Sequence, residues 1–133
     1  MNRPITALIL FFAALLLSAC VEQDPLTGST TATVLAGPVF TVTERTLGGG
    51  TQMIVRGTVK NNGKTVWSPI WLVEGQFYAD STFTYKLGGS TQAFTYSLAK
   101  GEATSFELRF NSTTLDLSDY PKFAVRNLRV VQN

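Results

Sequence analysis

The chain has 133 residues, with 11 Lys and Arg, 9 Asp and Glu, one Cys and no His. This length suits one small domain, and the net charge of +2 lacks the basic excess of nucleic-acid-binding proteins. Without His, Ser-His-Asp and Cys-His nucleophile pairs and His metal ligands are excluded. A single Cys forms neither an intrachain disulfide nor a zinc knuckle. We therefore expect no cofactor, no metal and no nucleic-acid partner.

Residues 1–19 are typical of a signal peptide. Arg3 supplies a positive charge, and an apolar stretch follows over residues 5–17. That stretch suits a signal-peptide core and is shorter than the roughly 20 residues needed to span a membrane. It ends in the letters LSAC, whose last residue is Cys20. This motif resembles the lipobox of bacterial lipoproteins; the alternative is an ordinary secretory signal in which Cys20 is incidental.

The lipobox resemblance implies cleavage before Cys20 and lipidation of its thiol. A diacylglyceryl group and further acyl chains such as palmitate would then make the membrane a partner, since burial contributes about 0.8 kcal/mol per CH₂. The next residue is Val21. In Gram-negative lipoproteins an Asp at that position commonly favours the inner membrane. The resemblance therefore implies an extracytoplasmic, lipid-anchored protein of the cell envelope, on the periplasmic face of the outer membrane if the source is Gram-negative.

The rest of the chain divides into a tether and one domain. Residues 20–33 hold the Cys and a stretch that is poor in large apolar groups and rich in Thr, Ser, Gly and Pro, which is typical of a flexible linker. Residues 34–133 have strand-like patterning, and no segment of them shows a sustained helical period.

Seven runs of strand-forming residues are expected in this domain. They cover residues 39–43, 53–59, 66–78, 83–87, 94–97, 106–110 and 122–131. Seven short strands separated by regular turn signals are typical of an immunoglobulin-like antiparallel β-sandwich. A small barrel is the alternative architecture.

Turn residues suggest how these strands connect. Asn62-Gly63 is a strong signal for a two-residue hairpin, and Gly88-Gly89-Ser90 predicts a second hairpin between residues 83–87 and 94–97. A phase shift in the apolar pattern of the last run predicts a β-bulge near Asn127.

Three stretches resemble the FxLYD domain, a small immunoglobulin-like module of bacterial and archaeal envelope proteins. They are VRGTVKNNG at 55–63, GQFYAD at 75–80 and LAKGEATSF at 98–106. The second departs from the namesake motif, because Gly75 replaces its Phe, Phe77 replaces its Leu and Ala79 precedes Asp80. The resemblance implies an extracytoplasmic interaction or structural module and brings no catalytic residues.

Aromatic side chains are the candidate binding residues. The candidates are Trp67, Phe83, Tyr85, Phe94 and Tyr96. Trp67 lies at an expected hairpin end, either as an exposed contact residue or packed inside. The other four would form one aromatic face across the second hairpin, which is a platform for a glycan or a protein if it points outward. The core reading is favoured, because a small sandwich needs its large residues inside.

The acidic residues give no catalytic pattern. A glycosidase needs two carboxylates at a fixed separation, which the spacing here does not establish, and Asp116 and Asp119 lack the denser spacing of calcium loops. We expect a membrane-anchored envelope lipoprotein that acts as a non-catalytic binding or structural module for an envelope protein. The alternative is carbohydrate or peptidoglycan binding through the aromatic hairpin. An enzymatic role is the weakest of the three hypotheses.

Overall fold

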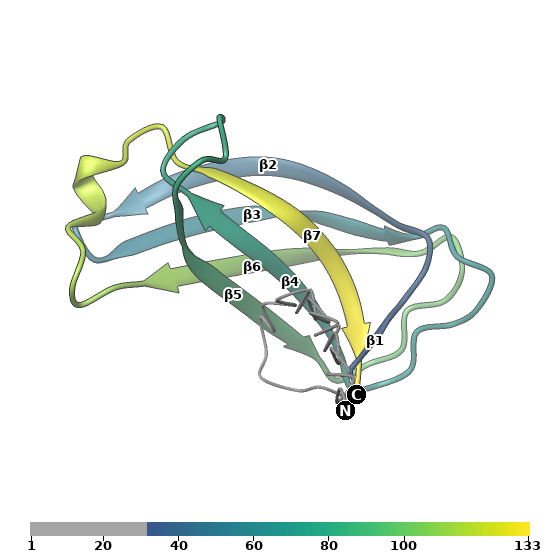
Figure 1. The fold of residues 1–133 in the computed structure, drawn as a ribbon. Helices are drawn as coiled ribbons and strands as arrows, with labels where there is room; N and C mark the ends of the chain where they lie inside the picture. The colour runs from purple at the N-terminus through teal and green to yellow at the C-terminus, as the bar shows by residue number, and fades with distance from the viewer. Residues whose placement is uncertain (1–31) are drawn as a thin grey trace, which may run out of the picture.

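The computed structural model describes residues 32–133 and shows two antiparallel β-sheets packed face to face (Figure 1). Its elements are β1 (Thr33–Val34), β2 (Pro38–Gly48), β3 (Gln52–Asn61), β4 (Trp71–Tyr78), β5 (Lys86–Phe94), β6 (Ala103–Asn111), the 3₁₀ turn η1 (Leu117–Asp119) and β7 (Ala124–Gln132). The four-stranded sheet has the order β1-β7-β4-β5, and the three-stranded sheet has the order β2-β3-β6. The expected all-β sandwich of seven strands is confirmed, with the four-plus-three division of an immunoglobulin-like fold.

The segments predicted to be a signal peptide and a tether, with Cys20 between them, lie outside the described residues as far as residue 31. Within residues 32–133, no helix has the length and apolar character needed to cross a membrane.

The core lies between the two sheets and follows from the period-two pattern of the strands. Alternate residues of β4 point inward, among them Trp71, Val73 and Phe77, and all three are fully buried. They meet apolar side chains of β3 and β6, including Met53 and Leu108.

The predicted hairpin around residues 88–90 is wrong. Residues 86–94 form one continuous strand, β5, which pairs with β4 along its length. Gly88 lies opposite Phe77, and a Cβ at this position would overlap the ring of Phe110. The glycine therefore permits close packing of two aromatic rings inside the core, and it does not reverse the chain.

The predicted Asn62-Gly63 hairpin is also wrong, because β3 and β4 belong to different sheets. The buried side chain of Asn61 organises the connection between them. Its Nδ2 donates to the carbonyls of Thr65 and Leu98, both at 2.9 Å, and its Oδ1 accepts from Gly63 N at 3.0 Å. A Cβ on Gly63 would come within 2.7 Å of the carbonyl oxygen of Ala36. Tertiary contact, rather than turn geometry, explains this glycine.

The predicted bulge in the last strand is confirmed. The β4–β7 register shifts between Glu74 and Gln76, and Asn127 has φ 55°. Asn is one of the few residues that adopts this left-handed conformation readily. Its Nδ2 donates to Gln76 Oε1 at 2.7 Å, which ties the bulge to the neighbouring strand.

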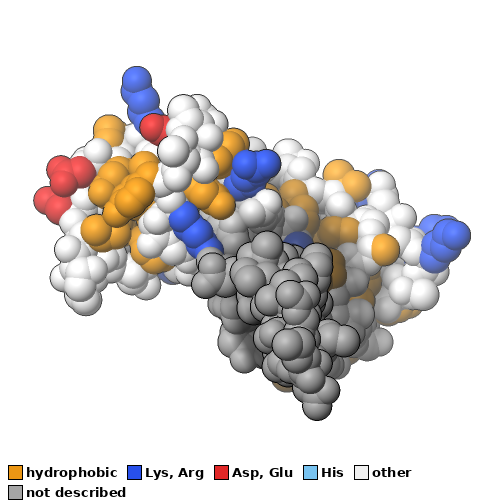
Figure 2. Space-filling view, viewed as in Figure 1, with side chains coloured by type: hydrophobic (Ala, Val, Ile, Leu, Met, Phe, Trp, Pro, Cys, Tyr) orange, Lys and Arg blue, Asp and Glu red, His pale blue; other side chains and the backbone are white. Residues whose placement is uncertain are grey.

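The two ends of the sandwich are formed by different segments of the chain. β1 pairs with the end of β7, so the start of the described chain and the C-terminus lie together at one end (Figure 1). The β2–β3 turn, the β4–β5 connection and η1 lie at the opposite end, which we call the tip. Figure 2 shows hydrophobic side chains gathered at the tip, with acidic side chains beside them.

Candidate functional site

Two of the five candidate binding residues are core residues. Trp67 is fully buried and packs against Trp71 with ring centroids 5.3 Å apart, so of its two alternatives the structure shows the packed one. An isolated β-bridge between Trp67 and Leu98 holds this residue against the core, while its neighbours Val66 and Ile70 are exposed. Phe94 is buried and stacks on Trp71 at 4.1 Å. Both side chains stabilise the fold through apolar burial.

Tyr85 and Tyr96 are exposed, at 55% and 49%, but they do not share a face. The whole of β5 lies between them, and nine residues of strand span about 30 Å. Tyr96 packs edge-on against Trp71, and its hydroxyl hydrogen-bonds with that of Thr104 at 2.6 Å. Tyr85 instead stacks on Tyr120, with ring centroids 6.3 Å apart. The single aromatic hairpin face is therefore not formed.

Phe83 occupies a strained position at the tip. Its φ is 56°, which is unusual for a bulky side chain and costs of order 1–3 kcal/mol. The half-buried ring packs edge-on against Tyr78 at 5.4 Å, and the Arg126 guanidinium lies 5.0 Å from its centroid. Asp80 Oδ1 accepts from Thr82 N at 2.8 Å, and hydrogen bonds from Thr82 lower the pKa of this carboxyl.

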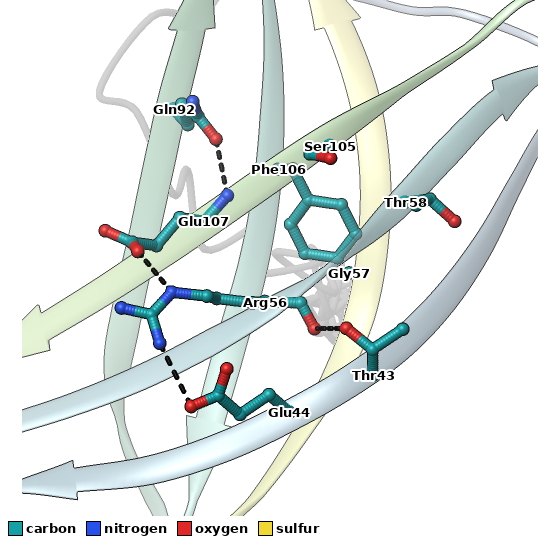
Figure 3. A pocket seen from close by; sticks show the side chains of 9 residues that line it. All are labelled: Thr43, Glu44, Arg56, Gly57, Thr58, Gln92, Ser105, Phe106 and Glu107. Carbon is teal, nitrogen blue, oxygen red and sulfur yellow. Dashed lines mark hydrogen bonds and ion pairs between the residues drawn. The ribbon is translucent and has the colours of Figure 1, made fainter.

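A charged row crosses the outer face of the three-stranded sheet (Figure 3). Arg56 of β3 lies between Glu44 of β2 and Glu107 of β6, which are its register partners. Its Nε donates to Glu107 Oε2 at 2.6 Å and its Nη1 to Glu44 Oε1 at 3.0 Å. Arg109 also forms an ion pair with Glu107. A shallow hollow of about 370 Å³ lies over this row.

The electrostatics of the charged row keep both carboxylates ionised. The pKa of Glu107 is lowered by hydrogen bonds from Arg109 and then from Arg56. The pKa of Glu44 is lowered by hydrogen bonds from the Thr46 hydroxyl and then from Arg56. A carboxyl that acts as a general acid near neutral pH needs a raised pKa. The row is thus suited to hold three strands together or to contact a polar partner.

Asp116, one of the two acidic residues near η1, has a structural role. Asp116 caps η1, because its Oδ1 accepts from Ser118 N at 3.0 Å and from the Ser118 hydroxyl at 2.5 Å. The hydroxyl and then the backbone N–H of Ser118 lower the Asp116 pKa. In the described part of the chain, no three His, Cys, Asp or Glu side chains gather where a metal could bind.

Sequence reasoning missed the charged row and the way the sandwich closes along one edge. The row needs the register of three strands, of which β2 and β6 are far apart in sequence. The closed edge depends on Ser90 and Gln92 of β5, which bond to the backbone of β6. The available signal was polar residues at inward-facing positions of a strand, where apolar side chains are the rule.

Comparison of the chain with protein-family models, with curated proteins and with solved structures gives no match.

Proposed function

We propose that this protein is a lipid-anchored component of a bacterial cell envelope, whose β-sandwich is a non-catalytic binding or structural module. The observation that carries the proposal is the distance along the chain from the lipobox-like motif to the sandwich. The motif ends at Cys20, and β1 starts at Thr33. A linker of this length reaches at most about 45 Å when fully extended, so a lipid on Cys20 would hold the sandwich close to a membrane.

The arrangement of the ends supports this proposal. The tether joins the sandwich at β1, beside the end of β7 (Figure 1). The tip, with Phe83 and Tyr85, lies at the far end of the strands. An anchor at Cys20 would leave the tip and both long edges of the sheets accessible to another envelope component.

The lowered pKa values of the charged row support a non-catalytic role. The two carboxylates of the row, Glu44 and Glu107, are both held ionised by hydrogen bonds that include Arg56. Neither is set up to donate a proton near neutral pH. Binding therefore accounts for the described surface better than acid–base chemistry does.

A second candidate function is glycan binding at the tip. It is favoured by the exposed Tyr85 ring, which stacks on Tyr120 and lies close in sequence to Phe83. Aromatic rings with one free face stack on the apolar faces of sugar rings. The candidate glycan-binding surface is therefore the tip and not the aromatic hairpin face that the sequence suggested.

Substitution Cys20→Ala tests the anchor. We expect unprocessed precursor or release of the protein from membranes, measured by cell fractionation and intact-mass analysis. Substitution Val21→Asp is the matched control, since it leaves the acceptor Cys in place and should keep the lipid mass. Unchanged mature size and membrane association in Cys20→Ala would refute lipidation at this residue.

Binding is tested by in-cell crosslinking of the tagged, lipidated protein followed by mass spectrometry. One dominant envelope protein among the adducts supports a protein-binding module. For the glycan alternative, Tyr85→Ala should abolish retention on peptidoglycan while the Tm stays near the wild-type value. Tyr96→Ala, at the other end of β5 and similarly exposed, is its matched control and should retain binding.

A further inference from the structure

The edge strands on the two open sides of the sandwich differ in whether their outward backbone groups are hydrogen-bonded. On one side, β5 and β6 are the last strands of their sheets. Ser90 Oγ bonds to both the carbonyl and the N–H of Arg109, and Gln92 Oε1 accepts from Glu107 N at 2.6 Å. Side chains of β5 thereby satisfy three of the backbone groups that β6 directs away from β3, namely the N–H of Glu107 and both groups of Arg109. These bonds block an incoming strand along residues 107–109.

On the other side, β2 is a long edge strand of 11 residues that pairs with β3. The hydrogen bond from Asn62 N to Gly37 O, at 2.9 Å, sets the phase of this pairing. Hydrogen-bonded pairs recur at every second residue of an antiparallel ladder, so Val39 and Thr41 bond to β3. Phe40 and Val42 direct their N–H and C=O groups outward, and no residue between 32 and 133 bonds to those groups.

The open stretch of β2 is bounded on both sides. Pro38 has no N–H to offer at its start. At its other end a register shift between Val42 and Glu44 bends the strand, and such bulges limit edge pairing. Three residues, 40–42, therefore present a short segment of backbone that could extend the sheet.

A hollow adjoins this segment. It has a volume of about 510 Å³ and lies between β2 and β7, lined by Val42, Thr43, Glu44, Arg45 and Val125. Val42 is 41% exposed. The Arg45 guanidinium forms no ion pair with any carboxylate of the described chain, unlike Arg56, Arg109 and Arg129. The hollow thus combines apolar surface with an unpaired positive charge.

We propose that the β2 edge binds an extended segment of a partner polypeptide by adding it as a strand at residues 40–42. One apolar side chain of the segment enters the hollow against Val42 and Val125, and a carboxylate of the segment pairs with Arg45. Backbone hydrogen bonds supply affinity, and these two side-chain contacts supply selectivity. The inference rests on the proposed function of the domain as a binding module.

The charge of Arg45 argues for a different protein as the partner rather than a second copy. Two copies related by a two-fold axis would pair β2 with β2 in antiparallel orientation. A pair centred on residues 40–42 would place Arg45 of one copy opposite Gly37 of the other, and residues 35–39 hold no Asp or Glu. A second copy therefore offers no carboxylate to Arg45, whereas a segment of another protein can.

The test places a photocrosslinking residue at Val39 or at Thr41 of the full, lipidated chain in cells, with crosslinked residues identified by mass spectrometry. Both positions lie on one face of β2. We expect them to capture the same partner protein at residues two positions apart, which is the spacing of a paired strand. Val66, which is 53% exposed in the β3–β4 connection, is the control position and should give no such pair.

Two matched sets of variants test the chemistry of the site. Val42→Pro removes an outward N–H without touching the β2–β3 ladder and should lower adduct yield by more than about tenfold, whereas Val42→Thr should retain it. Arg45→Glu should lower the yield similarly, and Arg45→Lys should retain it. The Arg45 pair keeps the test decisive if Val42→Pro does not fold.

Adducts without the two-residue spacing, adducts between two copies of this chain, or yields unaffected by Val42→Pro and Arg45→Glu would overturn the inference. A crosslinker placed at Tyr85 distinguishes failure of the β2 site from failure of the proposed binding function. Partner adducts from Tyr85 alone would leave the binding module standing and remove the β2 site. Absence of adducts from both places would overturn the strand-addition proposal and protein binding, and would leave glycan binding at the tip, while Cys20→Ala tests the anchor independently.

Discussion

Ser90 Oγ donates a hydrogen bond to the carbonyl of Arg109 at 2.7 Å and accepts one from the N–H of the same residue at 3.1 Å. One hydroxyl on β5 thus satisfies both outward backbone groups of an edge residue on β6. This relationship joins the two sheets along one side and leaves the β2 side as the open one. It also explains why a small polar residue lies at an inward-facing position of β5, opposite Gly75.

Ser90→Ala should destabilise the fold by about 1–2 kcal/mol, since it leaves two backbone groups at the sheet junction without their partner. Urea denaturation of the full chain measures the change. Ser97→Ala, at an exposed loop position, is the control and should change the free energy of unfolding by less than about 0.5 kcal/mol. Equal effects of the two substitutions would show that the junction is not a source of stability.

The two buried tryptophans should respond differently to Phe. Trp71 Nε1 donates to the carbonyl of Tyr96 at 2.8 Å, whereas no described residue accepts from Trp67 Nε1. Trp71→Phe loses packing and a hydrogen bond, while Trp67→Phe loses packing and also removes an unpaired buried donor. We expect Trp71→Phe to cost about 1–3 kcal/mol more in unfolding free energy. A larger cost for Trp67→Phe in chemical denaturation would contradict this account.

The charged row predicts a dependence of stability on pH. The folded-state pKa values of Glu44 and Glu107 lie below the ordinary value of 4.5, mainly through hydrogen bonds from Thr46 and Arg109, respectively, with Arg56 adding to both. Groups with depressed pKa values bind more protons when unfolded. Their contribution is therefore complete above about pH 4.5 and is lost as the pH falls through the folded-state values. The Tm should fall over this acidic range.

Glu107→Gln isolates the contribution of the row, because Asp80 and Asp116 have lowered pKa values of the same sign. The variant should lose less Tm than the wild type between pH 6 and pH 3. Asp119→Asn, outside the row, is the matched control and should keep the wild-type slope. Identical slopes for all three proteins would mean that the row does not contribute to acid sensitivity.

The bulge in β7 predicts a preference for residues that tolerate positive φ. Asn127→Gly should change the unfolding free energy by less than about 1 kcal/mol, because glycine adopts φ 55° without strain. Asn127→Ala should cost about 1–2 kcal/mol, since alanine resists this conformation and loses the bond to Gln76. Thermal denaturation of the two variants measures the difference. An alanine variant more stable than the glycine variant would contradict the positive-φ conformation at residue 127.

Local patterns predicted much of the fold. The inward faces of β3 and β4 follow from alternation around Val55 and Val73, because successive strand residues point to opposite sides. Asn127 marked its bulge through a phase shift in the same alternation. The predicted number of strands, seven, agrees with the structure, but the strands are not all the same. The predicted runs 83–87 and 94–97 are replaced by the single strand β5, and β1 was not expected.

The sequence by itself determined which segments form strands and excluded chemistry that needs His. It also predicted lipidation at Cys20. These depend on residue identity and on spacing along the chain. Only the tertiary structure decided the roles of Gly63 and Gly88, the burial of Trp67, and the pairing of Arg56 with Glu44 and Glu107. Each of these features requires two segments that are distant in sequence to meet. For the glycines there is a further reason: a glycine suits both a tight turn and a close approach of two segments, so its presence in the sequence does not tell the two apart.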